Sequence, residues 1–330
     1  MGVEDIPPLV SICIPVKNGE GRLEHCLASL RALDYPQDRI EIIIADGLST
    51  DRTVAIARSF GAIVLDNPNQ TVASGRNLSF AAAKGEFIAS TDDDCIVPTD
   101  WLVTGLKAFE APGVAAVGGP SYLPEETSAL AKAANTVFRM ASLGGYSVQA
   151  DHFVAGSAED LPGCNALYRA SVFKQAGLFD EGLITAEDVD IHLRIRDLGH
   201  ALAVLPDFFV WHHKRATLPG LFKQLRRFAA GRVQLARKRP EALRPMHKIA
   251  GWAWGYGLAA LAILLAVTSL PLTIALIVAG WLVISAVGLW QGEKVGTALL
   301  VPLALLVIVL GWSTGYLAET FFPMASTAGR

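Results

Sequence analysis

The last quarter of the chain is almost free of charge, and this feature constrains its fold more than any other. Residues 249–330 contain only four charged side chains, whereas residues 1–248 carry the other 55. Three successive stretches have no charge at all: 249–268, 271–290 and 297–318. A hydrocarbon core about 30 Å thick needs about 20 helical residues, so each stretch predicts a transmembrane helix. The alternative, buried helices of a large soluble protein, fits less well because three such stretches in succession are unusual in a globular core.

A basic segment precedes these stretches. Residues 218–239 alternate apolar and basic positions at helical spacing, and nine Lys or Arg against one Glu lie between Lys223 and Lys248. Such a helix can lie in the headgroup plane and contact membrane lipids. The positive charge predicts a cytosolic location. We therefore expect a multi-pass protein of the cell membrane with a cytosolic catalytic domain and, after three crossings, its C-terminus outside.

Two shorter patterns bear on how these helices pack. Gly251-xxx-Gly255 and Gly311-xxx-Gly315 each offer a face on which another helix can pack closely. Residues 128–143 are apolar with two basic positions, which predicts either a second interfacial helix or ordinary domain packing.

Residues 1–217 alternate buried strands with amphipathic helices. Strands are predicted at 9–16, 40–45, 62–65 and 86–90, and helices at 22–33, 49–60 and 71–83. This alternation predicts an α/β fold with a mostly parallel, Rossmann-like sheet and functional sites at the carboxyl ends of its strands. The chain is thus expected to consist of an α/β domain (1–217), a basic amphipathic segment (218–248) and three transmembrane helices (249–330).

Carboxylates follow two of these strands. Asp46 ends the second strand, and Asp92, Asp93 and Asp94 follow the fourth. An acidic turn residue alone is often only a helix cap or a solvated turn. Three consecutive carboxylates repel one another and are best explained by a cation that neutralises them. Their oxygens suit Mg²⁺ or Mn²⁺, and in an extended segment Asp92 and Asp94 can share the metal while Asp93 turns aside.

Five segments, in order, resemble the landmarks of family 2 glycosyltransferases. They are VSICIPVKN at 10–18, IIIADGLSTD at 42–51, GRN at 75–77, AKGEFIASTDDDC at 83–95 and EDVD at 187–190. With the later motifs, the resemblance covers residues 9 to about 230. It implies a GT-A fold that binds a nucleotide-sugar, similar to the membrane-bound cellulose-synthase-like and dolichol-phosphate-pathway branch.

The resemblance implies a set of donor-binding residues. They are Pro15, Val16, Asp46, Arg76, Asp92, Asp93, Asn165 and Arg227. In the family pattern Pro15 and Val16 belong to the base pocket. Asp46 holds the nucleotide, through its base or its ribose, with Arg76 close to it. Asp92 and Asp94 become the pair that binds Mn²⁺ or Mg²⁺ at the donor diphosphate.

The acceptor side is implied in the same way. Its expected residues are Gly163, Glu187, Gln224 and Phe228. The match of Glu187-Asp188 to the family's Glu-Asp motif implies that Asp188 is the general base, which a weakly nucleophilic sugar hydroxyl needs. Without that match, the same residues would equally fit an acidic helix start. One direct displacement inverts the anomeric centre.

Two later motifs leave alternatives open. The pair His212-His213 follows a predicted strand, and such a pair is often merely packed or at the surface. The resemblance implies that His212 approaches the metal. The segment QLRRF at 224–228 resembles the Q-x-x-R-W motif with Phe228 in place of Trp, so Arg227 is expected to hold either the diphosphate or a lipid headgroup.

Cysteines and net charge add two expectations. The four cysteines lie far apart in the sequence without metal-ligand spacing, so we expect isolated small hydrophobic residues in a reducing environment. The net charge of −3 argues against a nucleic-acid partner.

Together these features imply a membrane-bound, metal-dependent inverting glycosyltransferase. It would move a sugar, with GDP-mannose favoured over UDP-sugars, from a nucleotide-sugar to a polyprenyl-linked acceptor lipid. A processive polysaccharide synthase that uses a UDP-sugar is the alternative within this class, although three helices offer little wall for a translocation channel. A non-catalytic membrane scaffold that binds nucleotide-sugars is the alternative from another class. Asp92, Asp94 and Asp188 together argue against that scaffold.

Overall fold

The computed structural model describes residues 6–142, 156–214 and 217–323. The chain forms two compact units. The first unit comprises Met1–Tyr122, Val148–Glu181 and Glu187–His213, and the second comprises Leu123–Ser147, Gly182–Ala186 and Lys214–Arg330. The second unit therefore includes helix α5 (Ala129–Ser142) from the middle of the sequence, which differs from the sequential division expected from the sequence.

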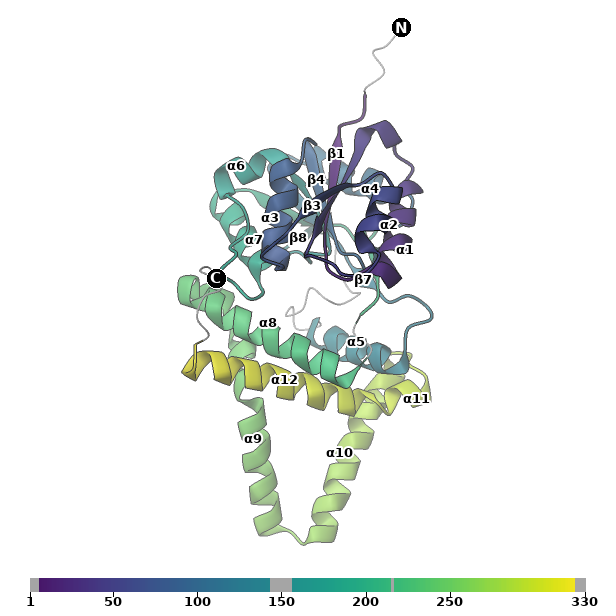
Figure 1. The fold of residues 1–330 in the computed structure, drawn as a ribbon. Helices are drawn as coiled ribbons and strands as arrows, with labels where there is room; N and C mark the ends of the chain where they lie inside the picture. The colour runs from purple at the N-terminus through teal and green to yellow at the C-terminus, as the bar shows by residue number, and fades with distance from the viewer. Residues whose placement is uncertain (1–5, 143–155, 215–216, 324–330) are drawn as a thin grey trace. The chain divides into compact units, whose positions relative to one another are not determined.

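An eight-stranded sheet forms the centre of the first unit among the described residues (Figure 1). In spatial order its strands are β3 (Ile63–Asp66), β2 (Ile40–Asp46), β1 (Val10–Val16), β4 (Phe87–Thr91), β9 (Asn165–Arg169), β6 (Val114–Gly118), β10 (Ala201–Val204) and β8 (Gly156–Ser157). The first four strands are parallel, and β10 is parallel to β6, whereas β9 and β8 run antiparallel to their neighbours. A smaller sheet has the order β5 (Cys95–Ile96), β11 (Val210–His212) and β7 (Ser121–Tyr122). The predicted α/β fold with a mostly parallel sheet is confirmed.

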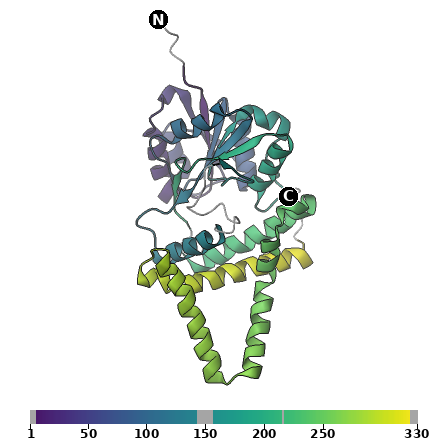
Figure 2. The ribbon, with the colours of Figure 1, turned by 180° about the vertical axis from the view of Figure 1, so that it is seen from behind.

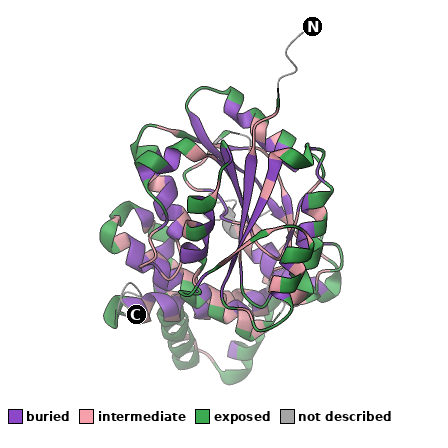
Figure 3. Cartoon of the chain, turned by 45° about the horizontal axis from the view of Figure 1, so that its top comes forward, coloured by how far each residue is buried: buried purple, intermediate pink, exposed green. Residues whose placement is uncertain are grey.

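Helices cover both faces of the large sheet. On one face lie α1 (Glu20–Arg31), α2 (Thr53–Ser59) and α4 (Trp101–Lys107), and on the other α3 (Val72–Ala82), α6 (Phe173–Ala176) and α7 (Glu187–Asp197). Side chains alternate between the two cores, so Ile12 and Ile14 join the first core and Cys13 the second. Strands buried on both faces are apolar throughout, and Figure 3 shows the central strands buried along their length.

The boundaries of the first four strands fall within one residue of those predicted. One helix start differs more: α2 begins at Thr53, not near Ser49. Local hydrogen bonds explain this later start. Asp51 Oδ1 accepts a hydrogen bond from the Thr53 N–H (3.0 Å), and the loop before Asp51 makes hydrogen bonds outside the helix. Within that loop, the Ser49 N–H donates to Asp46 Oδ2 (3.0 Å). The predicted cap residues therefore order the turn before the helix.

The second unit is helical wherever it has regular structure that the coordinates describe. Besides α5 it contains α8 (Leu218–Lys238), α9 (Pro245–Val267), α10 (Leu270–Trp290), α11 (Val295–Ala298) and α12 (Val301–Phe321). Three segments are long and apolar enough to cross a membrane, namely Pro245–Val267, Leu270–Trp290 and Val295–Phe321. Helices α9 and α10 form a hairpin with diverging arms, whereas α12 lies alongside α8 (Figures 1 and 2).

Small residues bring α12 close to α8. A Cβ added to Gly311 would lie 2.8 Å from the carbonyl oxygen of Phe222, and one added to Gly315 would lie 2.1 Å from that of Arg226. No side chain fits at such distances, so glycine is required at both positions. The predicted packing face at Gly311-xxx-Gly315 is confirmed, but its partner is the basic helix α8 rather than another long apolar helix. Of the other predicted pair, a Cβ added to Gly251 would lie 2.4 Å from the Tyr316 ring, whereas one added to Gly255 would meet nothing within 4 Å.

A buried histidine lies within the second core of the first unit. His192 on α7 is fully buried, and its Nδ1 accepts a hydrogen bond from the Leu161 N–H (3.2 Å). Its Nε2 lies 2.9 Å from the Tyr168 hydroxyl oxygen. Burial lowers the pKa of His192 from 6.5 to about 4. The ring is therefore neutral in the folded chain at neutral pH.

This pKa predicts a loss of stability in mild acid. The unfolded chain binds a proton at this histidine near pH 6.5, whereas the folded chain binds it only near pH 4, so unfolding becomes easier as the pH falls between these values. We expect His192 to contribute a loss of about 2 kcal/mol in unfolding free energy between pH 7 and pH 5. In denaturant unfolding of the full chain in detergent, His192→Gln should flatten the pH profile. Parallel profiles for the two proteins would contradict this role.

Candidate active site

Most of the predicted donor-side residues lie at one edge of the large sheet. Pro15 and Val16 end β1, Asp46 ends β2, and Asp92 follows the last residue of β4. The register pairs Val16 with Asp46, and β1 pairs in parallel with β4. Because the carboxyl ends of parallel strands share an edge, these residues meet although they are far apart in the sequence.

Arg76 on α3 connects two carboxylates at this edge. Its side chain is buried, and it donates to Glu187 Oε1 through Nη1 (2.8 Å) and to Asp92 Oδ1 through Nη2 (3.4 Å). Burial alone would lower the pKa of Arg76, but the charges of Asp92, Glu187 and Asp188 outweigh it and raise the pKa. Gly163 gives the guanidinium room, since a Cβ there would lie 2.8 Å from Nη2.

Asp92 and Asp94 lie in a region with excess negative charge. Burial raises the pKa of Asp92 to about 7, because the favourable effect of Arg76 is partly offset by the charges of Cys164 and Asp94. Burial is the largest cause of this rise, and Arg76 does not offset burial together with the neighbouring negative charges. A hard divalent cation bound by carboxylate oxygens fits this location.

His212 on β11 adds a nitrogen donor beside these carboxylates. Its Nε2 lies 3.3 Å from Asp94 Oδ1, and its Nδ1 lies 3.8 Å from Cys164 Sγ. Burial alone would lower the pKa of His212, but Cys164 and Asp94 outweigh it and raise the pKa. With Nδ1 directed at the sulfur, Nε2 is the ring nitrogen that faces Asp94 and could bind a metal beside it, and a ligating histidine usually has its other nitrogen held in this way.

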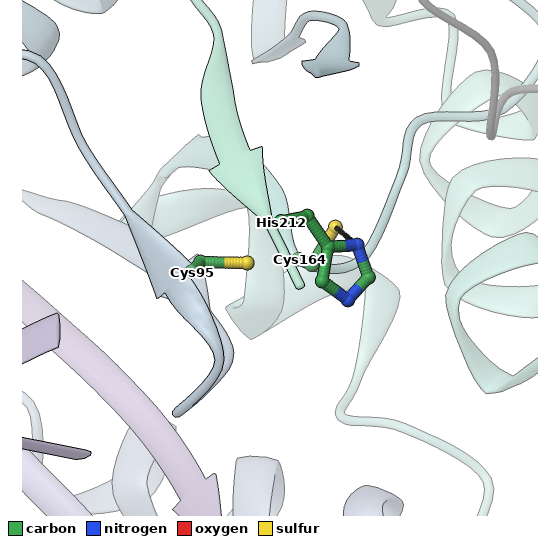
Figure 4. A group of neighbouring side chains, drawn as sticks. All are labelled: Cys95, Cys164 and His212. Atoms are coloured by element: carbon green, nitrogen blue, oxygen red, sulfur yellow. Dashed lines mark hydrogen bonds between the residues drawn. The ribbon is translucent and has the colours of Figure 1, made fainter. Parts of the chain in front are cut away.

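Two of the cysteines are not isolated, contrary to the prediction. The ligand atoms of Cys95, Cys164 and His212 all lie within 4.8 Å of one another (Figure 4). The small sheet causes this, because β5 and β11 pair Cys95 with His212. Thiolate and imidazole donors together suit zinc better than magnesium. Cys13 and Cys26 are buried in the cores of the first unit, as predicted.

Two expected donor residues make their contacts within the protein. The Asp93 carboxylate pairs with Arg22 (2.7 Å). Asn165 is fully buried, its Oδ1 accepts from Trp101 Nε1 (2.9 Å), and its Nδ2 donates to two backbone carbonyl groups, one of them that of Phe208 (2.7 Å). These contacts hold the segments that surround the site in place. A contact of Asp93 or Asn165 with a donor stays a prediction.

The predicted base lies at the start of α7. Glu187 is buried and bonded to Arg76, whereas the next residue, Asp188, is partly exposed and accepts a hydrogen bond from the Val189 N–H (2.8 Å). Just before them, Ala186 has a φ of 69°, a left-handed conformation that is costly for a non-glycine residue. Such strain often occurs at functional sites.

Buried polar atoms without partners concentrate at this edge. Among the described residues, four buried side-chain nitrogen or oxygen atoms have no hydrogen-bond partner, and three of them are Asp46 Oδ1, Arg76 Nε and Thr91 Oγ1. Buried polar groups are nearly always hydrogen-bonded, so these atoms favour a ligand here. Thr91 was missed by sequence reasoning, although its place directly before Asp92 is a usable signal.

The remaining predicted residues belong to the second unit. Gln224, Arg227 and Phe228 lie on α8, where the Arg227 carbonyl oxygen accepts a hydrogen bond from the Thr185 hydroxyl (2.9 Å). Their roles toward donor, acceptor or lipid stay predictions.

A cavity of about 530 Å³ lies in the first unit, away from the predicted site. It is lined by Phe80, Arg169 and other residues at the ends of β4 and β9 that are opposite to Asp92, and it contains none of the predicted site residues.

Comparison with known proteins finds a family whose sequence model matches this chain. A sequence model of the family described as Glycosyl transferase family 2 matches residues 11–177, half of the chain. Glycosyltransferase AglE of Haloferax volcanii is 26% identical over 258 residues, which cover 74% of this chain and 80% of AglE. A dolichyl N-acetyl-alpha-D-glucosaminyl phosphate 3-beta-D-2,3-diacetamido-2,3-dideoxy-beta-D-glucuronosyltransferase of Methanococcus voltae is 25% identical over 245 residues, covering 69% and 74%. Other relatives are longer, and the chain covers about half of their length.

A solved structure has the same fold. The mannosyltransferase PcManGT from Pyrobaculum calidifontis, in complex with GDP-Man and Mn²⁺, superposes with a TM-score of 0.66 at 21% sequence identity. The match covers 96% of this chain and 87% of that protein.

The buried position of Arg76 predicts a large effect of its removal. Arg76→Met would remove the guanidinium from the buried Glu187 and the partly exposed Asp92, so we expect a loss of about 3 kcal/mol or more in unfolding free energy. The matched control is Arg22→Met, because the Arg22–Asp93 pair is partly exposed (43% for Arg22) and its loss should cost about 1 kcal/mol or less. Denaturant unfolding without added ligand measures both. Equal losses would contradict a special role for Arg76.

Proposed function

The chain belongs to glycosyl transferase family 2, and on that premise we propose that it is a membrane-bound, metal-dependent inverting glycosyltransferase. It transfers a sugar from a nucleotide-sugar to a polyprenyl-linked acceptor lipid. The observation that carries this proposal is the group of polar side chains at the strand ends, where Asp92 pairs with the buried Arg76 and Asp94 pairs with His212. The three unpaired polar atoms at the same edge support a ligand there.

The metal would be held by Asp92, Asp94 and His212. Two carboxylates and one imidazole suit Mn²⁺, and Mg²⁺ accepts the same oxygens. A bound divalent cation would stabilise the negative charge of the departing nucleoside diphosphate. The chain's own contribution is to keep Asp92 in place through Arg76 and to orient His212 through Cys164.

The nucleotide would be bound at the ends of β1 and β2. The unpaired Oδ1 of Asp46 offers an acceptor to a base or ribose donor, while Oδ2 is held by Ser49. Pro15 and Val16 supply an apolar wall beside it. Arg76 keeps its charge at any physiological pH, which favours a negatively charged donor near this edge.

Asp188 would act as the general base. It is partly exposed and keeps one carboxylate oxygen free of the hydrogen bond to Val189, whereas Glu187 is engaged with Arg76. The carboxylate takes the proton of the acceptor hydroxyl as that oxygen forms its bond to the anomeric carbon. The bond from that carbon to the diphosphate breaks on the opposite side, so the configuration inverts.

The acceptor assignment depends on the second unit. Helices long enough to span a membrane and the positive charge of the basic helix α8 support a location at a cytosolic membrane face. The Methanococcus voltae relative is named for a dolichyl phosphate substrate, which supports a polyprenyl-linked acceptor. The Pyrobaculum calidifontis structure contains GDP-Man, which supports GDP-mannose as the first donor to test.

Removing the proposed base should abolish transfer without affecting donor binding. Asp188→Asn keeps the size of the side chain but cannot take a proton, so we expect transfer to a lipid extract to fall by about 10² to 10⁴-fold. The control is Asp197→Asn at the exposed end of the same helix, which should keep full activity. Full transfer by the Asp188 variant would overturn the assignment.

A donor screen tests the rest of the proposal. With Mn²⁺, the correct nucleotide-sugar at 100 times its Kd should stabilise the folded chain by about 2.7 kcal/mol, seen as a higher Tm. GDP-mannose, UDP-glucose, UDP-N-acetylglucosamine and the metal alone form the panel. Asp92→Asn combined with Asp94→Asn should remove the Mn²⁺-dependent part. A UDP-sugar as the best ligand would replace GDP-mannose, and no stabilisation by any nucleotide-sugar would sink the proposed function.

A further inference from the structure

The middle and the end of α12 contact the same helix. In the middle, Gly311 and Gly315 rest on the backbone of α8 at Phe222 and Arg226. Near its end, the fully buried carboxylate of Glu319 accepts a hydrogen bond from Arg237 Nη1 of α8 at 2.7 Å. The two helices therefore lie side by side over most of the length of α12, as Figures 1 and 2 show.

This pairing decides whether α12 can cross a membrane. Its 21 residues extend about 30 Å, the thickness of a hydrocarbon core. If α12 crossed, its two ends would lie on opposite sides, and α8 would have to cross beside it. Helix α8 contains six cations: Lys223, Arg226, Arg227, Arg232, Arg237 and Lys238. Each costs about 2.5–3.5 kcal/mol at the centre of a bilayer, so α8 cannot cross, and α12 cannot cross without it.

The contacts between α12 and the α9–α10 hairpin also indicate that α12 does not cross the membrane. Ser313 Oγ donates to a carbonyl oxygen near the beginning of α9 (2.8 Å), and a Cβ added to Gly288, near the end of α10, would lie 3.0 Å from Val301. Midway along the two arms, a Cβ added to Gly257 or Gly280 would meet nothing within 4 Å. Helix α12 thus passes across the open end of the hairpin and does not run along its arms.

A further contact fixes the end of the hairpin. After α10, Glu293 pairs with Arg139 of α5 (3.3 Å) and accepts a hydrogen bond from the Thr136 hydroxyl (3.0 Å). Helix α5 precedes every apolar segment, and among the described residues no span separates it from α8 in the sequence. The turn after α10 is therefore on the same side of the membrane as α5 and α8.

We propose that only α9 and α10 cross the membrane, and that α8 and α12 form a two-helix platform lying flat in the membrane interface. In this arrangement the exposed apolar side chains of α12, such as Leu306 and Phe321, face acyl chains. The cations of α8 lie at the level of anionic headgroups. The C-terminus then returns to the side of the sugar-transfer domain, which replaces the three crossings and the outside C-terminus expected from composition.

Reporter fusions to the full chain test this topology. Green fluorescent protein and alkaline phosphatase are each fused after Arg330, inserted between Ser269 and Leu270, or placed before Met1, and expressed in a Gram-negative host, where the phosphatase is active only outside the cytoplasm. We expect fluorescence without phosphatase activity at both termini, and phosphatase activity at the hairpin insertion. Phosphatase activity at the C-terminus would restore three crossings and overturn the platform. An inactive phosphatase at the hairpin would overturn the two crossings.

Charge reversal tests the pairing that carries the argument. Glu319→Arg places a second cation next to Arg237 at a position where the side chain is fully buried, so we expect the yield of monodisperse protein in detergent to fall severalfold. Adding Arg237→Glu restores opposite charges and should recover most of that yield. Glu241→Arg, at an exposed position, is the matched control and should leave the yield unchanged. Failure of the double variant to recover would count against the pairing. Both tests are independent of sugar transfer, so the platform can fail while the proposed function stands.

Discussion

The site of the first unit depends on one buried cation among several carboxylates. Arg76 bonds Glu187 and Asp92, which come from α7 and from the end of β4, and it thereby joins parts of the chain that are far apart in the sequence. One guanidinium faces several carboxylates there, and the pKa of Asp92 is raised mainly by burial and further by neighbouring negative charges such as that of Asp94. The same negative charge that would destabilise an isolated protein makes this edge suited to a divalent cation and a diphosphate. Glu187 and Asp188, adjacent in the sequence, thereby differ in availability, since one is held by Arg76 and the other stays accessible.

A different constraint shapes the second unit, where close backbone approach replaces charge. Gly311 and Gly315 let α12 rest on the backbone of α8, and the pair of the buried Glu319 with the partly exposed Arg237 fixes the position along the helices. In the most apolar part of the segment that contains α12, 33% is buried against protein, compared with 6% for α9 and 17% for α10. Three segments of similar composition therefore differ in their partners, which explains how one of them can take a different place in the membrane.

Much of this organisation could be predicted from the sequence, for physical reasons that also explain the failures. Strands buried on both faces are apolar throughout, so the predicted bounds of β1, β2 and β4 lie within one residue of those observed. The shared edge of parallel strand ends put Asp46 and Asp92 at the same edge of the sheet, on either side of β1. Contacts that depend on the return of distant segments were not predictable. Cys95 and Cys164 are far apart in the sequence and meet beside His212 only because β11 pairs with β5. Likewise, the amphipathic pattern of α5 does not reveal which unit covers it, and the apolar composition of α12 does not reveal that its neighbour is a basic helix.

The pairing of α8 with α12 also has a consequence for how the protein is made. In the sequence the whole hairpin lies between the end of α8 and the beginning of α12. In the proposed topology, α8 is therefore made before the helix that rests on its backbone at Phe222 and Arg226, and this surface stays uncovered until the hairpin has turned back through the bilayer. If the second arm fails to return, α12 is delivered to the wrong side and α8 keeps an open apolar surface next to its cations. Helices α8 and α12 can thus pair only when the hairpin has been inserted correctly. An unpaired α8 exposes apolar surface of the kind that cellular quality control recognises.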